Sequence, residues 1–354
     1  MSGTSPEKLP PHAPAPRRSL GRRIAKGAGI GVASIGGLVV LVVGVVLVGA
    51  NVDPGRHFIE REVSSLTGNT VVASGLSGRF PDALKLAKIE LRDKKGAWLI
   101  IENLKLDWSP LRMIGRTVQV DLLQFDRLAI PRLPESDGTK SSSSGPTKTG
   151  LGINIKSVDA KWIEIGAPVA GLPAVFALQG HAVAPQLDPL INGVSFRTLP
   201  KADIAVDLKR LDAQGTIKVA AQTDAHDLAL DLTAQEGADG IVASMSKMPE
   251  LAPVTLTFHM AGPTNAAALD FKAGLGKIAS VISGRLDLLA STADVTAKFD
   301  APAMSLNDSI GWQSVALDTH LKGAYTAPSG TGTLTVKGLA AGATQIGSLD
   351  ANFE

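Results

Sequence analysis

The sequence predicts a mainly β protein, with a single N-terminal transmembrane helix followed by an elongated, curled antiparallel β-sheet and a few short amphipathic helices. One long apolar stretch lies near the N-terminus, apolar and polar residues alternate with a period of two through most of the remaining chain, and aromatic residues make up only 4% of the sequence. A sheet that is apolar on one face and encloses no solid core needs few large rings. We therefore expect the apolar face to line an open groove.

The apolar stretch, Gly27 to Ala50, contains no charged residue and predicts the transmembrane helix. At about 1.5 Å per residue it is long enough to cross a hydrocarbon core of about 30 Å. Five basic residues lie just before it: Arg17, Arg18, Arg22, Arg23 and Lys26. No acidic residue occurs between Glu7 and Asp53, which places the N-terminus in the cytoplasm. A cleaved signal peptide is the alternative, although its apolar core typically has only about 7–15 residues.

The sequence divides into three regions. Residues 1–23 are rich in Pro and basic residues and predict a disordered cytoplasmic tail. Residues 24–50 form the predicted single-pass anchor, and residues 51–354 form a β-sheet domain on the far side of the membrane. Within that domain, the Ser-, Gly- and Thr-rich stretch 135–150 predicts a flexible loop. The last residues still alternate like a strand, so we expect the native sheet to continue beyond Glu354.

Composition excludes several functions. Residues 1–26 hold six of the 35 basic and one of the 33 acidic residues, so the rest of the chain has no basic excess and is not expected to bind nucleic acid. The chain has no cysteine, which excludes disulfides and thiolate chemistry. Its six histidines are scattered, without the spacing of metal ligands, and no catalytic motif is present. We expect no enzyme activity, no cofactor and no metal.

Three short helices interrupt the strand pattern. Asp53 to Leu66 is predicted to be helical, with Asp53 as its N-cap and Gly68 after its end. Ser109-Pro110 begins a second helical turn. Residues 239–248 predict a third helix, whose apolar side chains pack on the sheet.

The strands are predicted from alternation and from the turns between them. Leu84 and Leu86 are out of phase with Ile89 and Leu91, which indicates a bulge near Ala87-Lys88. Alternating apolar residues of several strands are the candidates for the groove lining: Val118, Val120, Leu122, Ile204, Val206, Leu208, Leu228, Leu230, Leu256 and Phe258. A sandwich or a β-helix with a filled core has the same periodicity and remains the alternative.

Short motifs after the predicted anchor occur in a characteristic order. The residues are Gly75-Leu76-Ser77-Gly78-Arg79-Phe80-Pro81, Gly96-Ala97-Trp98-Leu99, Leu106-Asp107-Trp108-Ser109-Pro110 and Ala129-Ile130-Pro131-Arg132-Leu133-Pro134. This order resembles the N-terminal region of the TamB family, inner-membrane subunits of the translocation and assembly module of Gram-negative bacteria. The resemblance covers most of residues 24–290 and is strongest over 58–134.

The resemblance implies a function and partners. TamB-like proteins belong to the AsmA-like group of bridge-like lipid transporters, so it implies an inner-membrane-anchored periplasmic protein whose apolar groove carries phospholipid to the outer membrane. It also implies a link to autotransporter assembly with a TamA-like outer-membrane protein, although the family's partner-binding C-terminal domain has no counterpart in this sequence. The alternative is a periplasmic scaffold or chaperone that offers strand edges to outer-membrane proteins.

Overall fold

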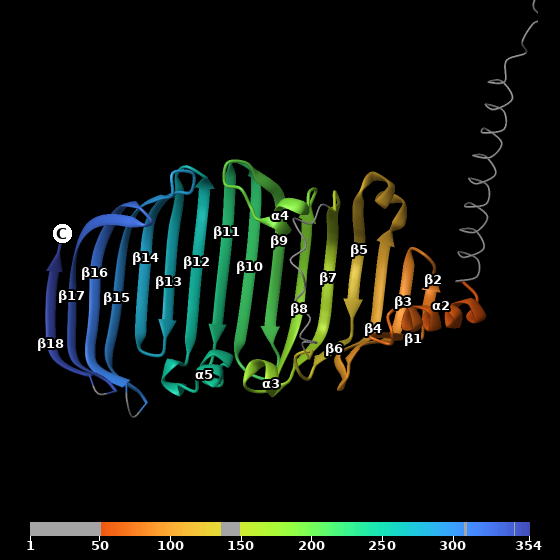
Figure 1. The fold of residues 1–354 in the computed structure, drawn as a ribbon, viewed down its shortest axis with the longest axis horizontal. Helices are drawn as coiled ribbons and strands as arrows, with labels where there is room; N and C mark the ends of the chain where they lie inside the picture. Colours follow the sequence, from red (N-terminus) through yellow and green to blue (C-terminus); the bar gives the residue numbers. More distant parts are fainter. Residues whose placement is uncertain (1–50, 136–148, 308–309, 343) are drawn as a thin grey trace, which may run out of the picture.

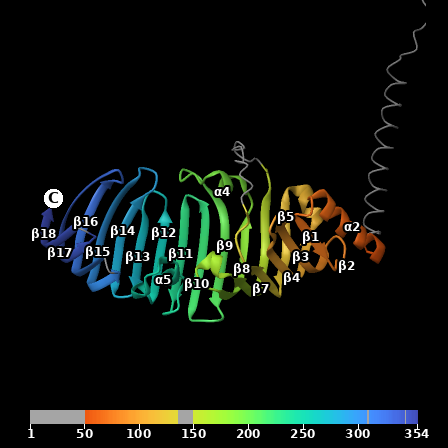
Figure 2. The ribbon, with the colours of Figure 1, turned by 60° about the horizontal axis from the view of Figure 1, so that its bottom comes forward.

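The described residues form one long curled sheet. The computed structural model describes residues 51–135, 149–307, 310–342 and 344–354, and they build a sheet of 18 strands (Figure 1; Figure 2). The mainly β prediction is confirmed. The predicted tail and anchor, and most of the predicted loop at 135–150, lie outside the described residues. In the described part of the chain, no helix is both long and apolar enough to span a membrane.

The first nine strands belong to the N-terminal half of the sheet. They are β1 (Val71–Ser74), β2 (Ser77–Arg79), β3 (Ala83–Asp93), β4 (Gly96–Ser109), β5 (Thr117–Phe125), β6 (Arg127–Ile130), β7 (Gly152–Ile165), β8 (Ala174–Ala184) and β9 (Leu199–Arg210). The other nine are β10 (Gly215–Ala225), β11 (Asp227–Glu236), β12 (Val254–Pro263), β13 (Ala267–Leu275), β14 (Ile278–Asp287), β15 (Thr292–Asn307), β16 (Ile310–Ala324), β17 (Ala327–Ala341) and β18 (Thr344–Phe353).

The strand pairings follow the chain almost throughout. Strands β1 and β2 both pair with β3, and β5 and β6 both lie between β4 and β7. From β7 to β18 every strand pairs with the next one along the chain. With strands about 4.8 Å apart, the sheet is roughly 70 Å long.

One junction corrects the prediction of a wholly antiparallel sheet. Strand β7 runs parallel to both β5 and β6, with Thr117 beside Gly152 and Ile130 beside Ile165. Parallel neighbours cannot be joined by a hairpin, because the chain must first return to the other end of the strand. The chain between Ile130 and Gly152, of which the structure describes residues 131–135 and 149–151, makes this return.

Irregularities line up across the strands on the N-terminal side of β8. We call Ala87, Asn103, Asp126 and Lys161 the bulge row. Ala87 and Asn103 are absent from the register of β3 with β4, and Asn103 has φ of 53°. Asp126 separates β5 from β6, and Lys161 lies at a register shift of β7. The predicted bulge near Ala87-Lys88 is thus one member of a row that crosses several strands.

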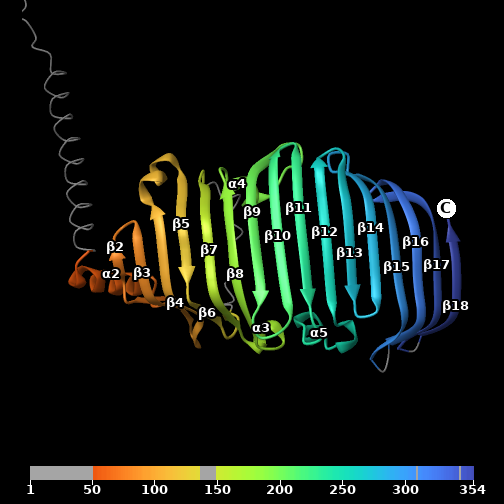
Figure 3. The same cartoon turned by 180° about the vertical axis from the view of Figure 1, so that it is seen from behind.

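The short helices lie at the ends and edges of the sheet. They are α2 (Asp53–Leu66), α3 (Ala167–Ala170), α4 (Asp188–Asn192) and α5 (Ile241–Ser246), with 3-10 helices η1 (Pro110–Gly115) and η2 (Pro249–Leu251). Helix α2 has the predicted bounds, but Val52 is its N-cap and Asp53 instead pairs with Arg56 at 3.1 Å. In Figure 3, α3 and α5 lie along one long edge and α4 along the other.

Helix α5 packs less than predicted. Ile241 contacts the buried cluster around Phe176, but Met245 is 60% exposed and Val242 is 39% exposed. A helix of six residues is too short to place four apolar side chains on the sheet at once. The prediction of the helix was right, whereas the prediction that its apolar residues share one buried face was wrong.

The sheet is a single layer. The strands of the described chain make their extensive contacts with their hydrogen-bonded neighbours, and no second sheet packs on either face. The buried clusters are small, one around Ile163 and Phe176 and the other around Leu228 and Met260. Among the described residues, Thr264 is the largest side chain that is fully buried. A filled sandwich core is therefore not present in this part of the chain.

Candidate functional site

The strand registers define which residues share a face. Cross-strand partners project to the same side of a sheet, and neighbours along a strand project to opposite sides. Val206 of β9 pairs with Gly180 of β8 and Val219 of β10, and Val219 pairs with Leu232 of β11. We call the side that carries these residues the apolar face and the opposite side the polar face.

Charge is segregated between the two faces from β8 to β18. The apolar face of these strands carries aliphatic, aromatic and small residues, such as Leu230, Phe258, Phe271, Ile282 and Leu317. Within the described registers its charged side chains are Arg210 and Glu236, both close to the long edge that holds α3 and α5. All other paired Asp, Glu, Lys and Arg residues of these strands lie on the polar face.

The apolar face remains partly accessible to solvent. Val206, Leu230 and Phe258 are half-buried, and Val219 is 38% exposed. In a globular domain such residues belong to the types that are most often fully buried. A continuous apolar surface of this size, without a protein layer over it, is typical of an interaction or ligand-binding surface.

The structure brings together nine of the ten predicted lining residues. Val118 and Val120 pair with Ile153 and Ile155 of β7, which place them on the apolar face. The seven candidates in β9, β11 and β12 lie on the same face, in register with one another.

Leu122 is the exception. Leu122 pairs with Asp107 whereas Val120 pairs with Trp108, and the register of β4 with β5 shifts between these two pairs. This shift places Leu122 on the polar face, so its prediction as a lining residue was wrong. Periodicity along β5 alone does not show a shift of this kind.

The sequence prediction also missed residues. Strands β13 to β17 extend the apolar face with Leu269, Phe299, Leu321 and Leu334, and the alternation in these strands is sufficient to identify them. The sequence did not identify Arg210. Its position two residues after Leu208 places it on the apolar face, where a charged side chain is not expected.

Arg210 closes the edge of the apolar face. Its side chain is 3% exposed and donates from Nε to Asp212 Oδ1 at 3.0 Å and from Nη1 to the carbonyl oxygen of Asp239 at 2.6 Å. Asp212 also accepts a hydrogen bond from the backbone N–H of Val175. Burial acts to raise the pKa of Asp212, but these hydrogen bonds lower it overall. The arginine thus links β8, β9 and the segment before α5.

The bulge row carries ion pairs on the polar face. Lys161 contacts Asp126 at 2.8 Å, and Lys156 contacts Asp121 at 2.6 Å near a second register shift. A hydrogen bond from each lysine holds the pKa of its aspartate below the usual range. Charged pairs therefore join β7, near each of its two register shifts, to β5 and to the residue between β5 and β6.

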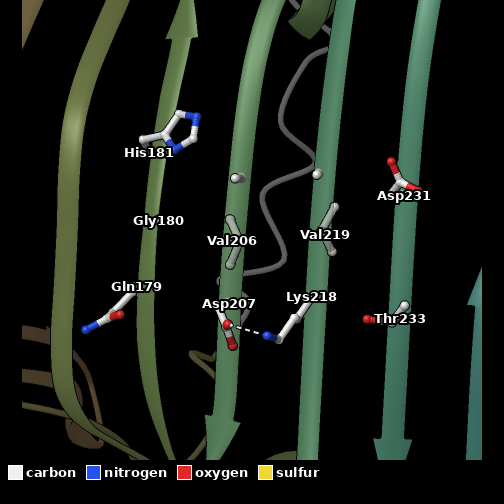
Figure 4. Close-up of a pocket in the computed structure, with 11 residues that line it drawn as sticks. Gln179, Gly180, His181, Val206, Asp207, Lys218, Val219, Asp231 and Thr233 are labelled. Carbon is white, nitrogen blue, oxygen red and sulfur yellow. Dashed lines mark ion pairs between the residues drawn. The ribbon is translucent and has the colours of Figure 1, made fainter.

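The polar face is charged and shallowly hollowed. One hollow of about 570 Å³ lies over Ala205 and Ala220, and the Asp207–Lys218 ion pair at 3.1 Å forms part of its wall (Figure 4). His259 pairs with Asp231 at 2.6 Å across the neighbouring strands. No group of three or more metal-ligating side chains occurs among the described residues. This face has the character of a solvated surface.

The comparisons with known proteins give no further identification. No protein-family model, no curated protein and no solved structure matches the chain.

Proposed function

We propose that the apolar face holds the acyl chains of phospholipids and that the chain is an inner-membrane-anchored periplasmic conduit of the TamB-like, AsmA-like type. The N-terminal anchor fixes one end of the sheet at the inner membrane. The face then offers lipid tails a path towards the outer membrane, in support of outer-membrane protein and autotransporter assembly. No catalytic group is needed for this activity.

The segregation of charge over β8 to β18 is the observation that carries the proposal. Each methylene group kept from water contributes roughly 0.8 kcal/mol, and an acyl chain meets no buried charge along these strands until the edge near Arg210. A surface for a folded protein partner would instead require matching polar groups at fixed positions. The apolar face supplies hydrocarbon contact without such positions, which suits a flexible and mobile tail.

Crosslinking at adjacent residues tests the proposal. A photoreactive amino acid at position 206 projects from the apolar face, whereas one at 207 projects from the polar face. In cells, we expect phospholipid adducts at 206 and few at 207, detected by mass spectrometry of the purified chain. Equal labelling at both positions would contradict the proposal.

A charge placed on each face provides a second test. Phe258→Asp introduces a carboxylate on the apolar face, and the matched control Thr257→Asp introduces it on the polar face of the same strand. We expect Phe258→Asp to abolish rescue of outer-membrane integrity in a deletion strain and Thr257→Asp to retain it. Circular dichroism of both purified variants checks that the sheet remains folded.

A scaffold function that offers strand edges to outer-membrane proteins is the second candidate. Within the described residues β18 pairs with β17 alone, and Asp350 is the one charged residue among its ten residues. Long edge strands with little charge readily accept another strand. In that case crosslinkers along β18, and not on the apolar face, would capture outer-membrane protein clients.

A further inference from the structure

Several exposed apolar side chains gather along one long edge of the sheet. They lie in η1 and in the segment from α4 to the start of β9, and we call them the apolar rim: Leu111, Met113, Ile114, Ile191, Val194 and Phe196. Ile114 is 84% exposed and Leu111 is 78% exposed. Single exposed apolar residues are common on protein surfaces, but six in two neighbouring segments form a patch that needs an explanation.

Hydrogen bonds hold the two segments of the rim side by side. The backbone N–H of Gly152 donates to the carbonyl oxygen of Arg116, directly after η1, and the N–H of Leu187 donates to the carbonyl oxygen of Leu151. Asp188, the first residue of α4, accepts hydrogen bonds from the backbone N–H groups of Thr149 and Gly150. The start of β7 therefore bridges η1 and α4, and the rim is one continuous edge.

The charge of the rim is basic. Arg112, Arg116 and Arg197 are exposed among its apolar side chains. Their guanidinium groups form no hydrogen bond and no ion pair with any residue that the structure describes. Asp188 is the acidic residue of the two segments, and its carboxylate is engaged by Thr149 and Gly150. Apolar side chains flanked by unpaired arginines are the combination that binds an anionic lipid surface.

Asn51, the residue after the predicted anchor, lies at the same edge of the sheet as the apolar rim. Its side chain exchanges two hydrogen bonds with the backbone of Phe80, at 2.9 and 3.0 Å, in the turn between β2 and β3. Trp108 joins this turn to the strand end before η1, because its backbone N–H donates to the carbonyl oxygen of Asp82 at 2.8 Å. The residue that directly follows the predicted anchor is thus held at the edge where η1 lies.

We propose that the apolar rim docks on the bilayer that holds the anchor, with its apolar side chains among the acyl chains near the surface and its arginines on the phosphates of anionic phospholipids. This inference rests on the anchor in the proposed function and adds the orientation of the sheet. The part of the long edge from η1 to α4 faces the membrane, and the later strands lead away from it. Lipid tails would then enter the apolar face from the edge at the rim.

Depth-dependent quenching tests the docking. The natural chain contains no cysteine, so Ile114→Cys and Phe196→Cys each give a single site for an environment-sensitive fluorophore. Met245→Cys is the matched control, since Met245 is also an exposed apolar residue but lies in α5, on the opposite edge. The full-length chain is reconstituted in vesicles of phosphatidylethanolamine and phosphatidylglycerol that contain a quencher-labelled lipid.

We expect strong quenching and a blue shift at positions 114 and 196 and neither at 245. Replacement of Arg112, Arg116 and Arg197 by Gln should shift the docking equilibrium by roughly 100-fold, because each basic side chain near an anionic surface contributes about 1 kcal/mol. That variant should lose the quenching at 114 and 196 while it still floats with the vesicles.

Two results would overturn the inference, and they are distinguishable. If the chain floats with the vesicles but positions 114 and 196 are quenched no more than 245, the rim does not dock. The proposals for the anchor and for the apolar face are then unaffected. If the chain does not float, the anchor itself fails and the docking of the rim fails with it. Equal quenching in vesicles of neutral phosphatidylcholine would contradict the role of the arginines.

Discussion

The strands before β8 and the strands from β8 onwards differ in how regularly their side chains alternate between the two faces. In β3 to β7 the alternation of side chains slips at the bulge row, and ion pairs such as Lys161–Asp126 lie at the slips. In β8 to β14 the registers run without a break except at Thr223/Ala225, near the end of β10. The early strands thus bend at fixed points, whereas the later strands rely on uniform twist.

The difference teaches how a one-layer sheet keeps its apolar residues on one side. A bulge moves every following side chain of its strand to the other face, so a single bulge would scatter the apolar residues. The bulge row avoids this because β3, β4, β7 and the position shared by β5 and β6 slip together. Leu86 and Ile89 therefore both lie on the apolar face although they are three positions apart in the sequence.

Among the changes that test this comparison, removal of the buried Arg210 side chain should lower the free energy of unfolding most. Arg210→Leu leaves the carbonyl oxygen of Asp239 without this donor and Asp212 without its cationic partner, at the border of the regular strands. We expect a loss of about 3 kcal/mol in the free energy of unfolding, measured by chemical denaturation. Lys209→Leu, an exposed polar-face change beside it, is the control and should cost less than about 0.5 kcal/mol.

A side chain at Gly75 should disturb the region of the bulge row by a smaller amount. Gly75 has φ of 70°, and an added Cβ would lie 2.4 Å from the Cβ of Ala87. We expect Gly75→Ala to lower the free energy of unfolding by about 2 kcal/mol, from the strained backbone together with the clash.

The control for this change separates the two causes. Gly68 has φ of 58° but open space around its added Cβ. Gly68→Ala should therefore show the backbone cost alone, about 1 kcal/mol. Equal losses at the two glycines would show that contact with Ala87 is not important for the bulge row.

Acid should affect the early strands more than the later ones. Hydrogen bonds from basic partners lower the pKa of several carboxyl groups there: Asp82, Glu90, Asp93, Asp121 and Asp126. Between β8 and β18 the pKa values of two carboxyl groups are lowered: that of Asp212, against the effect of its burial, by hydrogen bonds from Arg210 and Val175, and that of Asp294 by His320 and Lys322. A lowered pKa stabilises the fold above the unfolded value of about 4, and this contribution is lost progressively as the pH falls from that value through the lowered pKa of the folded state.

Hydrogen exchange monitored by mass spectrometry at pH 6 and at about pH 2.5 would measure this difference, after correction for the intrinsic rate. We expect peptides of β3 to β7 to lose more protection on acidification than peptides of β10 to β14. A uniform loss across the sheet would contradict the assignment of these ion pairs to the early strands.

A single ion pair of the bulge row should contribute least. Asp126→Asn removes the pair with Lys161, whose side chains are 39% and 55% exposed, so the expected loss is below about 1 kcal/mol. Asp318→Asn removes the more exposed Lys298–Asp318 pair of the later strands and should change the melting temperature by even less. A larger loss at Asp318 would reverse the comparison.

The sequence predicted well wherever the signal is local. Helix α2 has the predicted bounds, the protein is mainly β as predicted, and the irregularity after Leu86 lies where it was predicted. These features were predictable because periodicity and turn residues are properties of neighbouring residues. The prediction for Leu122 was wrong because the face of this residue is not a local property. Its face depends on a shift in pairing between β4 and β5, which the residues of β5 do not encode by themselves.

The sequence by itself determined that the strands alternate, that their charges fall on one parity, and that few large residues are available for a core. Only the tertiary structure decided that β5 and β6 share one position beside a parallel β7, that four slips align in a row, and that η1 and α4 meet at one edge. The physical reason is that alternation arises from the backbone of one strand, whereas pairing, register and neighbouring edges depend on segments far apart in the chain.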